Sequence, residues 1–285
     1  DAIGNGTAPH VADDRLPRPA DGLSRIRPPD RLLIFPDEAG DHLPGLISHV
    51  YGDIEQHRDD PSYYAKRAIL APLNNDVLAI NNLLMDDVPL LNPDDEMIFL
   101  SVTSIHQGFD DQLENLYPQD FLNRLSISGM PPHELRLRVG APILCIKNIS
   151  KTAGLINGTR LIIRRLSRHL IVADYWDSGE QKTAMIPRYP ITTTASNTPI
   201  PGVTLRRLQF PVLPGFAMTI NKSQGQTLTR VGVYLRTHCF GHGQLYTALS
   251  RGATYEGTKV AVAHGEDPHH TTNVVYPELI EKVYQ

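Results

Sequence analysis

The sequence predicts an α/β protein in which a parallel sheet with flanking helices is interrupted by a small β-rich module. Three observations carry this prediction. A strand–helix–strand pattern covers residues 67–101, short strands with turn signals fill residues 139–188, and α/β character resumes after a polar loop at residues 192–204. Strand, helix and strand in succession form the crossover unit of a parallel sheet, whereas closely spaced short strands are typical of small barrels.

Composition places the 285-residue chain among ordinary globular proteins, because 41% of its residues are hydrophobic and 20% are charged. Its formal net charge of −4 means that any binding of nucleic acid must rest on local positive patches. No apolar run is long enough to span a membrane, so we expect no membrane partner. Cys145 and Cys239 are too few for a disulfide framework and are expected to be reduced thiols.

The N-terminal segment has the composition of a connector. Residues 1–31 are rich in proline, glycine and aspartate and have no apolar period. The chain begins at Asp1 without a methionine, and we therefore expect it to be a piece of a longer protein.

The first α/β segment begins with a short apolar strand at residues 67–72. A helix is expected next, because Val77, Ile80 and Leu84 lie at helical spacing. Residues 97–101 are apolar and should form a second buried strand, which would complete a parallel crossover.

The β-rich module is predicted from four short apolar segments, which are residues 141–148, 159–166, 169–176 and 182–187. Asn157 and Gly158 separate the first two and suit a two-residue hairpin turn, because both residue types tolerate positive φ. The close spacing of these strands favours a small barrel over a crossover fold.

In the last α/β segment, residues 217–227 crowd polar side chains at the point where an apolar run enters a loop. At the carboxyl end of a parallel strand, such a point binds ligands, and free backbone N–H groups there attract phosphates. Lys222 adds a positive charge. A solvated turn with a helix cap explains the same residues equally well.

A helix is expected at residues 242–251, between strands at 231–235 and 258–263. Gln244 and Arg251 are seven residues apart and should return to one helix face after two turns. A planar, permanently charged guanidinium beside an amide suits a polyphosphate ligand. An exposed amphipathic helix is the commoner explanation of this pattern.

Together, AMTINKSQGQTL at residues 217–228 and HGQLYTALSR at residues 242–251 resemble motifs V and VI of the Pif-family DNA helicases. The resemblance covers roughly residues 63–262 and includes RAILAPLNNDVLAIN, GLINGTRLI, MIPR and RRLQFPV. It implies two RecA-like lobes with ATP bound between them, of which this chain would hold the second, interrupted by an SH3-like β-barrel.

The implied domains are a linker with a remnant of the first lobe at residues 1–58, the two parts of the second RecA-like lobe at 59–138 and 211–285, and the SH3-like insertion at 139–210. The resemblance also implies a nuclear or mitochondrial location and a role in genome maintenance.

Roles follow residue by residue from the same resemblance. Arg251 would be the arginine finger that reaches the γ-phosphate of ATP, and Gln244 would sense the nucleotide. Gln224 and Gly225 would link the DNA to the nucleotide cleft. Single-stranded DNA would be held by Thr219, Asn221, Lys222 and Ser223.

The sequence departs from a complete helicase because it contains no Gly-Lys dipeptide and hence no P-loop. Residues 32–38 mimic a Walker B strand, but Pro36 interrupts them, and a connecting loop is the preferred interpretation. ATP and Mg²⁺ would therefore be bound mainly by a first lobe that this sequence lacks.

The resulting hypothesis is the C-terminal motor lobe of an ATP-dependent 5′-to-3′ DNA helicase, inactive by itself. The alternative is a non-catalytic remnant of a truncated or transposon-derived helicase that binds single-stranded DNA.

No metal site is expected at His238, Cys239 and His242, because glycines interrupt any helix that would align them. Trp176 and Tyr175 could stack on bases, although a core position for one of them is equally plausible. A phosphate-contacting patch could form from Lys147, Lys151, Arg160, Arg164, Arg165 and Arg168.

Overall fold

The computed structural model describes residues 23–57, 60–88, 90, 92–107, 117–127, 129–177, 179–194, 197–264 and 268–275. Contacts within the chain divide it into two compact units, and each unit is assembled from segments that are distant in sequence. The α/β unit comprises residues 1–57, 66–82 and 216–285. The β-rich unit comprises residues 58–65 and 83–215.

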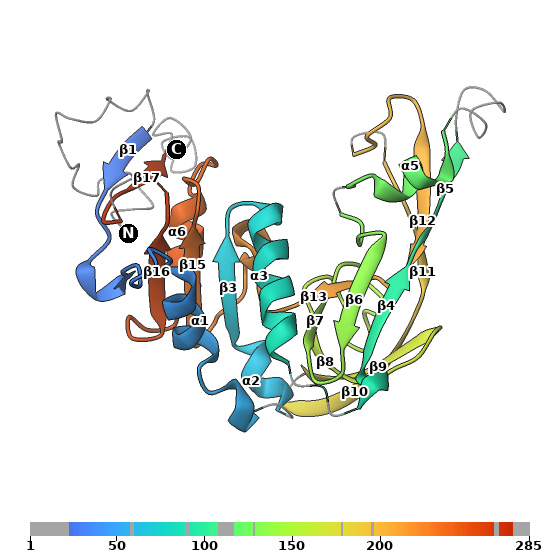
Figure 1. Ribbon diagram of the computed structural model, residues 1–285, viewed down its shortest axis with the longest axis horizontal. Helices are drawn as coiled ribbons and strands as arrows, with labels where there is room; N and C mark the ends of the chain where they lie inside the picture. The colour runs from blue at the N-terminus through green and yellow to red at the C-terminus, as the bar shows by residue number, and fades with distance from the viewer. Residues whose placement is uncertain are drawn as a thin grey trace. The chain divides into compact units, whose positions relative to one another are not determined.

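A five-stranded parallel sheet forms the centre of the α/β unit (Figure 1). In spatial order its strands are β14 (Ala217–Thr219), β3 (Arg67–Ala71), β15 (Arg230–Leu235), β16 (Thr258–Val262) and β2 (Leu33–Ile34). Because all five strands run the same way, their carboxyl ends meet at one edge, where α/β proteins bind ligands.

Short helices and an antiparallel ribbon complete the α/β unit. The ribbon pairs β1 (Leu23–Ile26) with β17 (Thr271–Val274). The helical elements are the 3-10 helices η1 (Asp30–Leu32), η2 (Ile54–His57) and η4 (Ile220–Ser223), and the α-helices α1 (Leu43–Tyr51), α3 (Asn74–Asp87) and α6 (Gln244–Leu249). By its contacts, α3 runs from the α/β unit into the β-rich unit.

Helix α1 packs against β15, β3 and β16 through the fully buried Leu46 and Val50. Gly232 of β15 permits this close approach, since a Cβ atom there would lie 2.8 Å from Cγ of Leu46. A larger residue at this position would push α1 away from the sheet.

The β-rich unit contains three antiparallel sheets (Figure 1). The largest has the strand order β10 (Glu180–Pro187), β9 (Leu170–Asp177), β8 (Arg160–Leu166), β7 (Pro142–Cys145) and β13 (Val212–Pro214). The others are β11 (Tyr189–Thr192), β12 (Thr204–Gln209) and β5 (Val102–Gln107), and the pair β4 (Glu96–Leu100) and β6 (Glu134–Arg138). Helical elements here are η3 (Pro93–Asp95), α2 (Pro61–Ala65) and α5 (Gln119–Arg124).

One arginine organises the interior of this unit. Arg207 is 1% exposed, and its guanidinium donates to five acceptors, at distances of 2.9 to 3.3 Å. Three of them are the carbonyls of Leu122, Asn123 and Leu125, at the C-terminal end of α5. Carbonyls at a helix end have no partner within the helix, so Arg207 satisfies groups that would otherwise be buried unpaired.

The expected parallel crossover at residues 67–101 is wrong. The structure pairs β4 with β6 in antiparallel register, with Ile98 opposite Arg136, and it pairs β3 with β14 and β15. Ile98 and Leu100 are 53% and 55% exposed, so this apolar segment has one buried face and not two. Residues 83–138 accordingly lie with the β-rich unit, whereas the sequence placed residues 59–138 in the α/β lobe.

Candidate functional site

The candidate site lies at the carboxyl edge of the parallel sheet, where η4 follows β14 and packs against α6. Thr219 is the last residue of β14, and Asn221 and Lys222 occupy the turn that follows it. The side chain of Gln244, the first residue of α6, donates from Nε2 to Oδ1 of Asn221 at 3.5 Å. The two segments that carry the sequence motifs are therefore brought together in space.

Gln244 is a buried residue that holds neighbouring segments of the site in place. Its side chain is 4% exposed, and its Oε1 accepts hydrogen bonds from the N–H groups of Phe240 and Gly241 at 3.0 and 3.3 Å. The amide thus fixes the loop that enters α6 and also reaches Asn221. Its polar atoms are already used for positioning neighbours.

Arg251 lies beyond the helix, because α6 ends at Leu249 and Ser250 is its C-cap. The expected two-turn helix through residue 251 is therefore wrong, and Gln244 and Arg251 do not share a helix face. The Arg251 guanidinium donates from Nε to the Thr247 carbonyl at 3.0 Å, from Nη1 to the Gln226 carbonyl at 2.9 Å, and from Nη2 to Oγ of Ser250 at 2.9 Å.

Arg251 is nevertheless held toward the polar loop and outside the core. Its side chain is partly exposed, and its bond to Gln226 ties it to the segment that follows η4. A guanidinium has five N–H donors, so three hydrogen bonds leave two donors for a ligand.

Lys222 is the exposed cation of the site. Within the described part of the chain, its ammonium has no hydrogen-bond or ion-pair partner. Desolvation by the surrounding protein lowers its pKa. An incompletely hydrated cation without a carboxylate partner is a suitable contact for a phosphate.

Ser223 differs from its neighbours. Its side chain is 0% exposed, and its hydroxyl donates to the Ile220 carbonyl at 2.6 Å. The last residue of the 3-10 turn faces inward, so the geometry gives no support to the expected DNA contact from Ser223.

Gln224 and Gly225 connect this turn to the arginine. Both are exposed, and Gly225 has φ +81°, a left-handed conformation that glycine adopts without strain. The next residue, Gln226, is the one whose carbonyl accepts from Arg251. A short segment therefore joins Lys222 to the guanidinium.

Comparison with known proteins shows similarity to one family. A family model described as "DNA helicase Pif1, 2B domain" matches residues 120–166. ATP-dependent DNA helicase PIF1 of Homo sapiens is 33% identical over 129 residues, which cover 44% of this chain and 19% of that protein. PIF1 of Danio rerio is 30% identical over 187 residues, covering 61% of this chain and 26% of that protein.

The chain is related to the C-terminal part of Pif1-family helicases. A further relative, ATP-dependent DNA helicase RRM3 of Saccharomyces cerevisiae, is 39% identical over 89 residues, covering 30% of this chain and 12% of that protein. The chain spans about a fifth to a quarter of the PIF1 proteins of Homo sapiens and Danio rerio, because it covers 19% and 26% of their lengths.

Solved Pif1 structures show the same fold. Pif1 helicase from Candida albicans has a TM-score of 0.52 at 21% identity, covering 85% of this chain and 57% of that one. Pif1 from Bacteroides, in complex with ADP-AlF3 and ssDNA, has a TM-score of 0.52 at 23% identity, covering 85% and 52%. The α/β unit therefore has the RecA-like fold with a parallel sheet that occurs in the Pif1 family.

Other candidate groups of this Pif1-related chain have local structural roles. The Asp37 carboxylate accepts from the N–H groups of Ala39 and Asp41, both at 2.9 Å, and so shapes the loop after β2. Burial raises the pKa of Cys239 to about 12, which keeps its thiol protonated. Among the described residues, no group of three or more His, Cys, Asp or Glu side chains could hold a metal ion.

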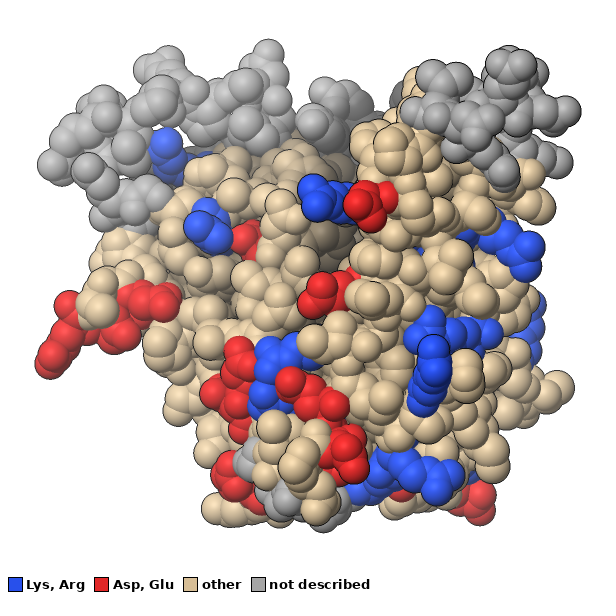
Figure 2. All heavy atoms as spheres, turned by 45° about the vertical axis from the view of Figure 1, so that its right-hand side comes forward, with Lys and Arg blue, Asp and Glu red and all other residues tan. Residues whose placement is uncertain are grey.

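The basic patch predicted on the β-rich unit is smaller than expected. Arg160 is buried and donates to the Tyr64 carbonyl at 2.7 Å, and Arg164 pairs with Asp174 at 2.7 Å. The exposed cations of the predicted set are Lys147, Lys151, Arg165 and Arg168. Figure 2 shows one face on which Lys and Arg side chains form separate groups, several of them next to acidic side chains.

The two aromatic candidates differ in their exposure to solvent. Tyr175 is buried and donates to the Ala153 carbonyl at 2.6 Å, whereas Trp176 is exposed. Only Trp176 is therefore accessible to a base.

In the described part of the chain, no helix has the length and apolar character needed to cross a bilayer.

Proposed function

We propose that this chain is the second, C-terminal motor lobe of an ATP-dependent DNA helicase that moves 5′ to 3′ on single-stranded DNA. One observation carries this proposal. An edge of the parallel sheet holds the exposed Lys222, whose ammonium has no partner among the described residues, and the partly exposed Arg251. By itself the chain is proposed to be inactive, because it has no Gly-Lys dipeptide and hence no P-loop.

Single-stranded DNA binds at the turn after β14 in this proposal. Lys222 contacts a phosphate, and Asn221 and Thr219 add exposed or partly exposed hydrogen-bonding groups on the same turn. Each neutralised phosphate releases counterions, so the affinity depends on salt concentration.

The nucleotide binds on the arginine side, with Mg²⁺ held mainly by the first RecA-like lobe. ATP hydrolysis supplies the free energy that opens and closes the two lobes. In this chain Arg251 is the residue that can contact the nucleotide, because its guanidinium has N–H donors that are not used within the chain. Gln244 is already bonded to Asn221 and to the loop before α6. An arginine finger is worth about 10³–10⁵-fold in the rate of related NTPases.

Coupling between the two ligands follows from the chain itself. Gln224 and Gly225 lie between Lys222 and the Gln226 carbonyl that holds Arg251. A displacement of Arg251 toward a phosphate breaks or lengthens that bond and so acts on the DNA-contacting turn.

An SH3-like barrel at residues 139–210 is proposed within the β-rich unit, which by its contacts also includes residues 58–65 and 83–138. Support comes from the antiparallel order β10-β9-β8-β7 in this region, which β13 extends just beyond it. Action on nuclear or mitochondrial DNA is part of the same proposal.

A non-catalytic module that binds single-stranded DNA is the second candidate. It is favoured by the Arg251 guanidinium, all of whose nitrogens donate to groups of its own chain. In that case Lys222 still binds phosphate, and Arg251 has only a structural role.

The experiment that tests the common DNA site measures the affinity of the chain for single-stranded DNA by fluorescence anisotropy over a range of salt concentrations. Lys222→Gln should weaken binding of all sequences alike and reduce the salt slope by about one unit. Lys182→Gln is the matched control, since that ammonium is already paired with Asp177 at 2.6 Å. An unchanged salt slope in Lys222→Gln would remove this turn from the DNA site.

A further inference from the structure

A cavity of about 380 Å³ opens at the carboxyl ends of β2, β15 and β16 in the α/β unit. Its lining comes from the loop after β2, from the ends of β15 and β16, and from Pro268. The size lies within the roughly 300–1,000 Å³ typical of small-ligand sites, and the edge is where α/β folds bind ligands. No residue of the two motif segments at 217–228 and 242–251 lines it.

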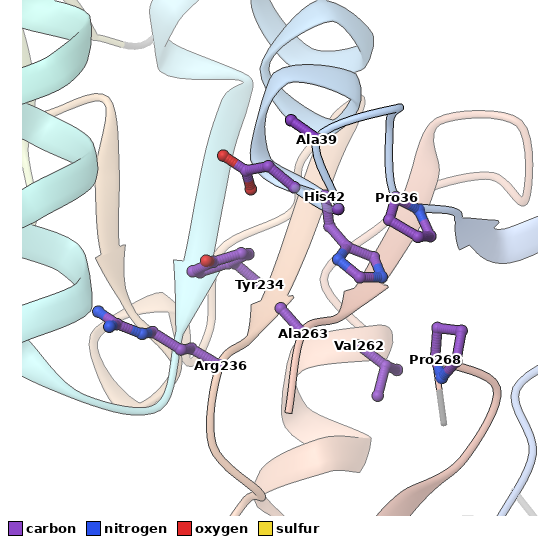
Figure 3. A pocket seen from close by; sticks show the side chains of 10 residues that line it. Pro36, Ala39, His42, Tyr234, Arg236, Val262, Ala263 and Pro268 are labelled. Carbon is purple, nitrogen blue, oxygen red and sulfur yellow. The ribbon is translucent and has the colours of Figure 1, made fainter. Parts of the chain in front are cut away.

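Two flat aromatic rings and two proline rings line much of this cavity. Figure 3 shows the imidazole of His42 among Pro36, Val262 and Pro268, with the ring of Tyr234 across the cavity. Rings of this kind pack well against a flat heteroaromatic ligand, whose faces are apolar and whose edge carries polar atoms.

The polar groups at the cavity still have bonding capacity. His42 is 7% exposed, and its Nε2 is buried without a hydrogen-bond partner. Desolvation lowers the pKa of this imidazole, so it is neutral at neutral pH. Asp41 is exposed, and its Oδ1 accepts from the Leu43 N–H at 2.9 Å, which leaves Oδ2 without a hydrogen bond among the described residues.

Charge at the cavity argues against an anionic ligand. Arg236 is the cation of the lining, and it lies 3.7 Å from Asp76, whose other oxygen is buried without a partner. Asp76 lies outside the lining, but its pairing with Arg236 leaves the Asp41 carboxylate as the unbalanced charge of the cavity, which disfavours a phosphate. A neutral ligand with hydrogen-bond donors on its edge matches this lining.

We propose that this cavity holds a nucleobase, stacked against Tyr234 and His42, whose exocyclic amino group donates to the Asp41 carboxylate. Adenine, cytosine and guanine carry such an amino group and thymine does not, so the site discriminates against thymine. The base belongs to a nucleotide of bound single-stranded DNA that is unstacked from its neighbours. Only this source of the base rests on the proposed function.

The test uses the complete chain and a short thymidine oligonucleotide that carries a single 2-aminopurine. Stacking in the cavity should quench the 2-aminopurine fluorescence. Tyr234→Ala should weaken this quenching interaction by about tenfold, whereas Tyr234→Phe keeps the ring and most of the effect. Tyr255→Ala, which removes an exposed tyrosine outside the cavity, is the matched control and should change nothing.

A second arm measures free cytidine and thymidine by saturation-transfer NMR. Cytidine should bind several-fold more tightly than thymidine, and Asp41→Asn should reduce that preference, because the acceptor loses its charge. Cytidine binding without quenching of the oligonucleotide would keep the base site and identify free nucleosides as its source.

The two proposals fail separately. If anisotropy shows normal DNA binding but neither quenching nor cytidine binding occurs, the base site is overturned and the proposed function stands. If the chain binds no DNA yet binds cytidine in a Tyr234-dependent way, the base site stands and the DNA-binding function falls. Quenching that survives Tyr234→Ala would also overturn the base site.

Discussion

In the β-rich unit Arg207 and Arg138 are buried and donate to acceptors of their own unit, whereas in the α/β unit Lys222 is exposed and has no partner among the described residues. The first two cations hold structure together, since Arg138 donates to the carbonyls of Asp86 and Val88 at 3.0 and 2.9 Å. The contrast teaches that a count of basic residues does not locate a ligand site. What matters is which cations retain unused bonding capacity.

The largest effect that bears on this contrast is expected at Arg251. In a two-lobed parent protein, Arg251→Ala should reduce DNA-stimulated ATP hydrolysis by about 10³-fold or more, because one finger contributes roughly that much. Affinity for single-stranded DNA should stay within a few-fold. Phosphate release and anisotropy measure the two quantities.

The variant Arg251→Lys tests whether a positive charge alone is sufficient at this position. Lysine keeps the charge but lacks the planar fork, so turnover should remain far below that of the parent. Persistent turnover in Arg251→Ala, with DNA binding lost, would show that Arg251 is not the arginine finger and would assign it a structural role at the DNA-binding turn.

The next largest effect concerns stability of the β-rich unit. Arg207→Met leaves the carbonyls of α5 unsatisfied in the interior and should lower the free energy of unfolding by about 3 kcal/mol or more. Urea unfolding measures it. Arg206→Met is the control on the same strand, since that side chain is exposed and should matter by about 0.5 kcal/mol or less. Equal losses in both variants would contradict the structural role of Arg207.

A smaller effect is expected from pH at Lys222. Desolvation lowers the pKa of this ammonium, so its charge is lost on raising the pH sooner than that of an ordinary lysine. DNA affinity should therefore fall as the pH rises through that lowered pKa, and Lys222→Gln should abolish this fall. Anisotropy titrations at neutral pH and near about pH 9.5 measure it. The same decline in the variant would point to another group.

The smallest effect is expected at Ser223. Its hydroxyl donates to the Ile220 carbonyl inside the unit, so Ser223→Ala should cost about 1 kcal/mol of stability and leave DNA affinity unchanged. Asn221→Ala, on the exposed side of the same turn, should weaken DNA binding. A loss of affinity in Ser223→Ala at full stability would restore this serine to the DNA site.

Several elements could be predicted from local pattern. The strands at residues 67–71, 230–235 and 258–262 and the helix at 74–87 were expected within a few residues, because apolar runs and helical spacing specify local conformation. The strand at residues 96–100 was also expected, but its partner was not. Apolar content alone does not tell whether both faces of a strand are covered, and Ile98 and Leu100 are exposed.

The candidate site could likewise be predicted only in part from the sequence. The resemblance to the Pif family linked residues 217–228 with residues 242–251, and the hydrogen bond from Gln244 to Asn221 joins them. The roles of individual side chains were less predictable. Nothing in the local sequence shows that Ser223 faces inward or that α6 ends at Leu249, because both depend on hydrogen bonds made after the chain has folded.

The sequence by itself determined the order of the α/β and β-rich segments, the related family and the absence of a P-loop, since each is a property of residue order along the chain. The tertiary structure decided which cations are buried and which remain free, that β4 pairs with β6, and that loops from three strands enclose a cavity around His42. These properties depend on segments far apart in sequence. Burial and hydrogen bonding are settled only when such segments meet.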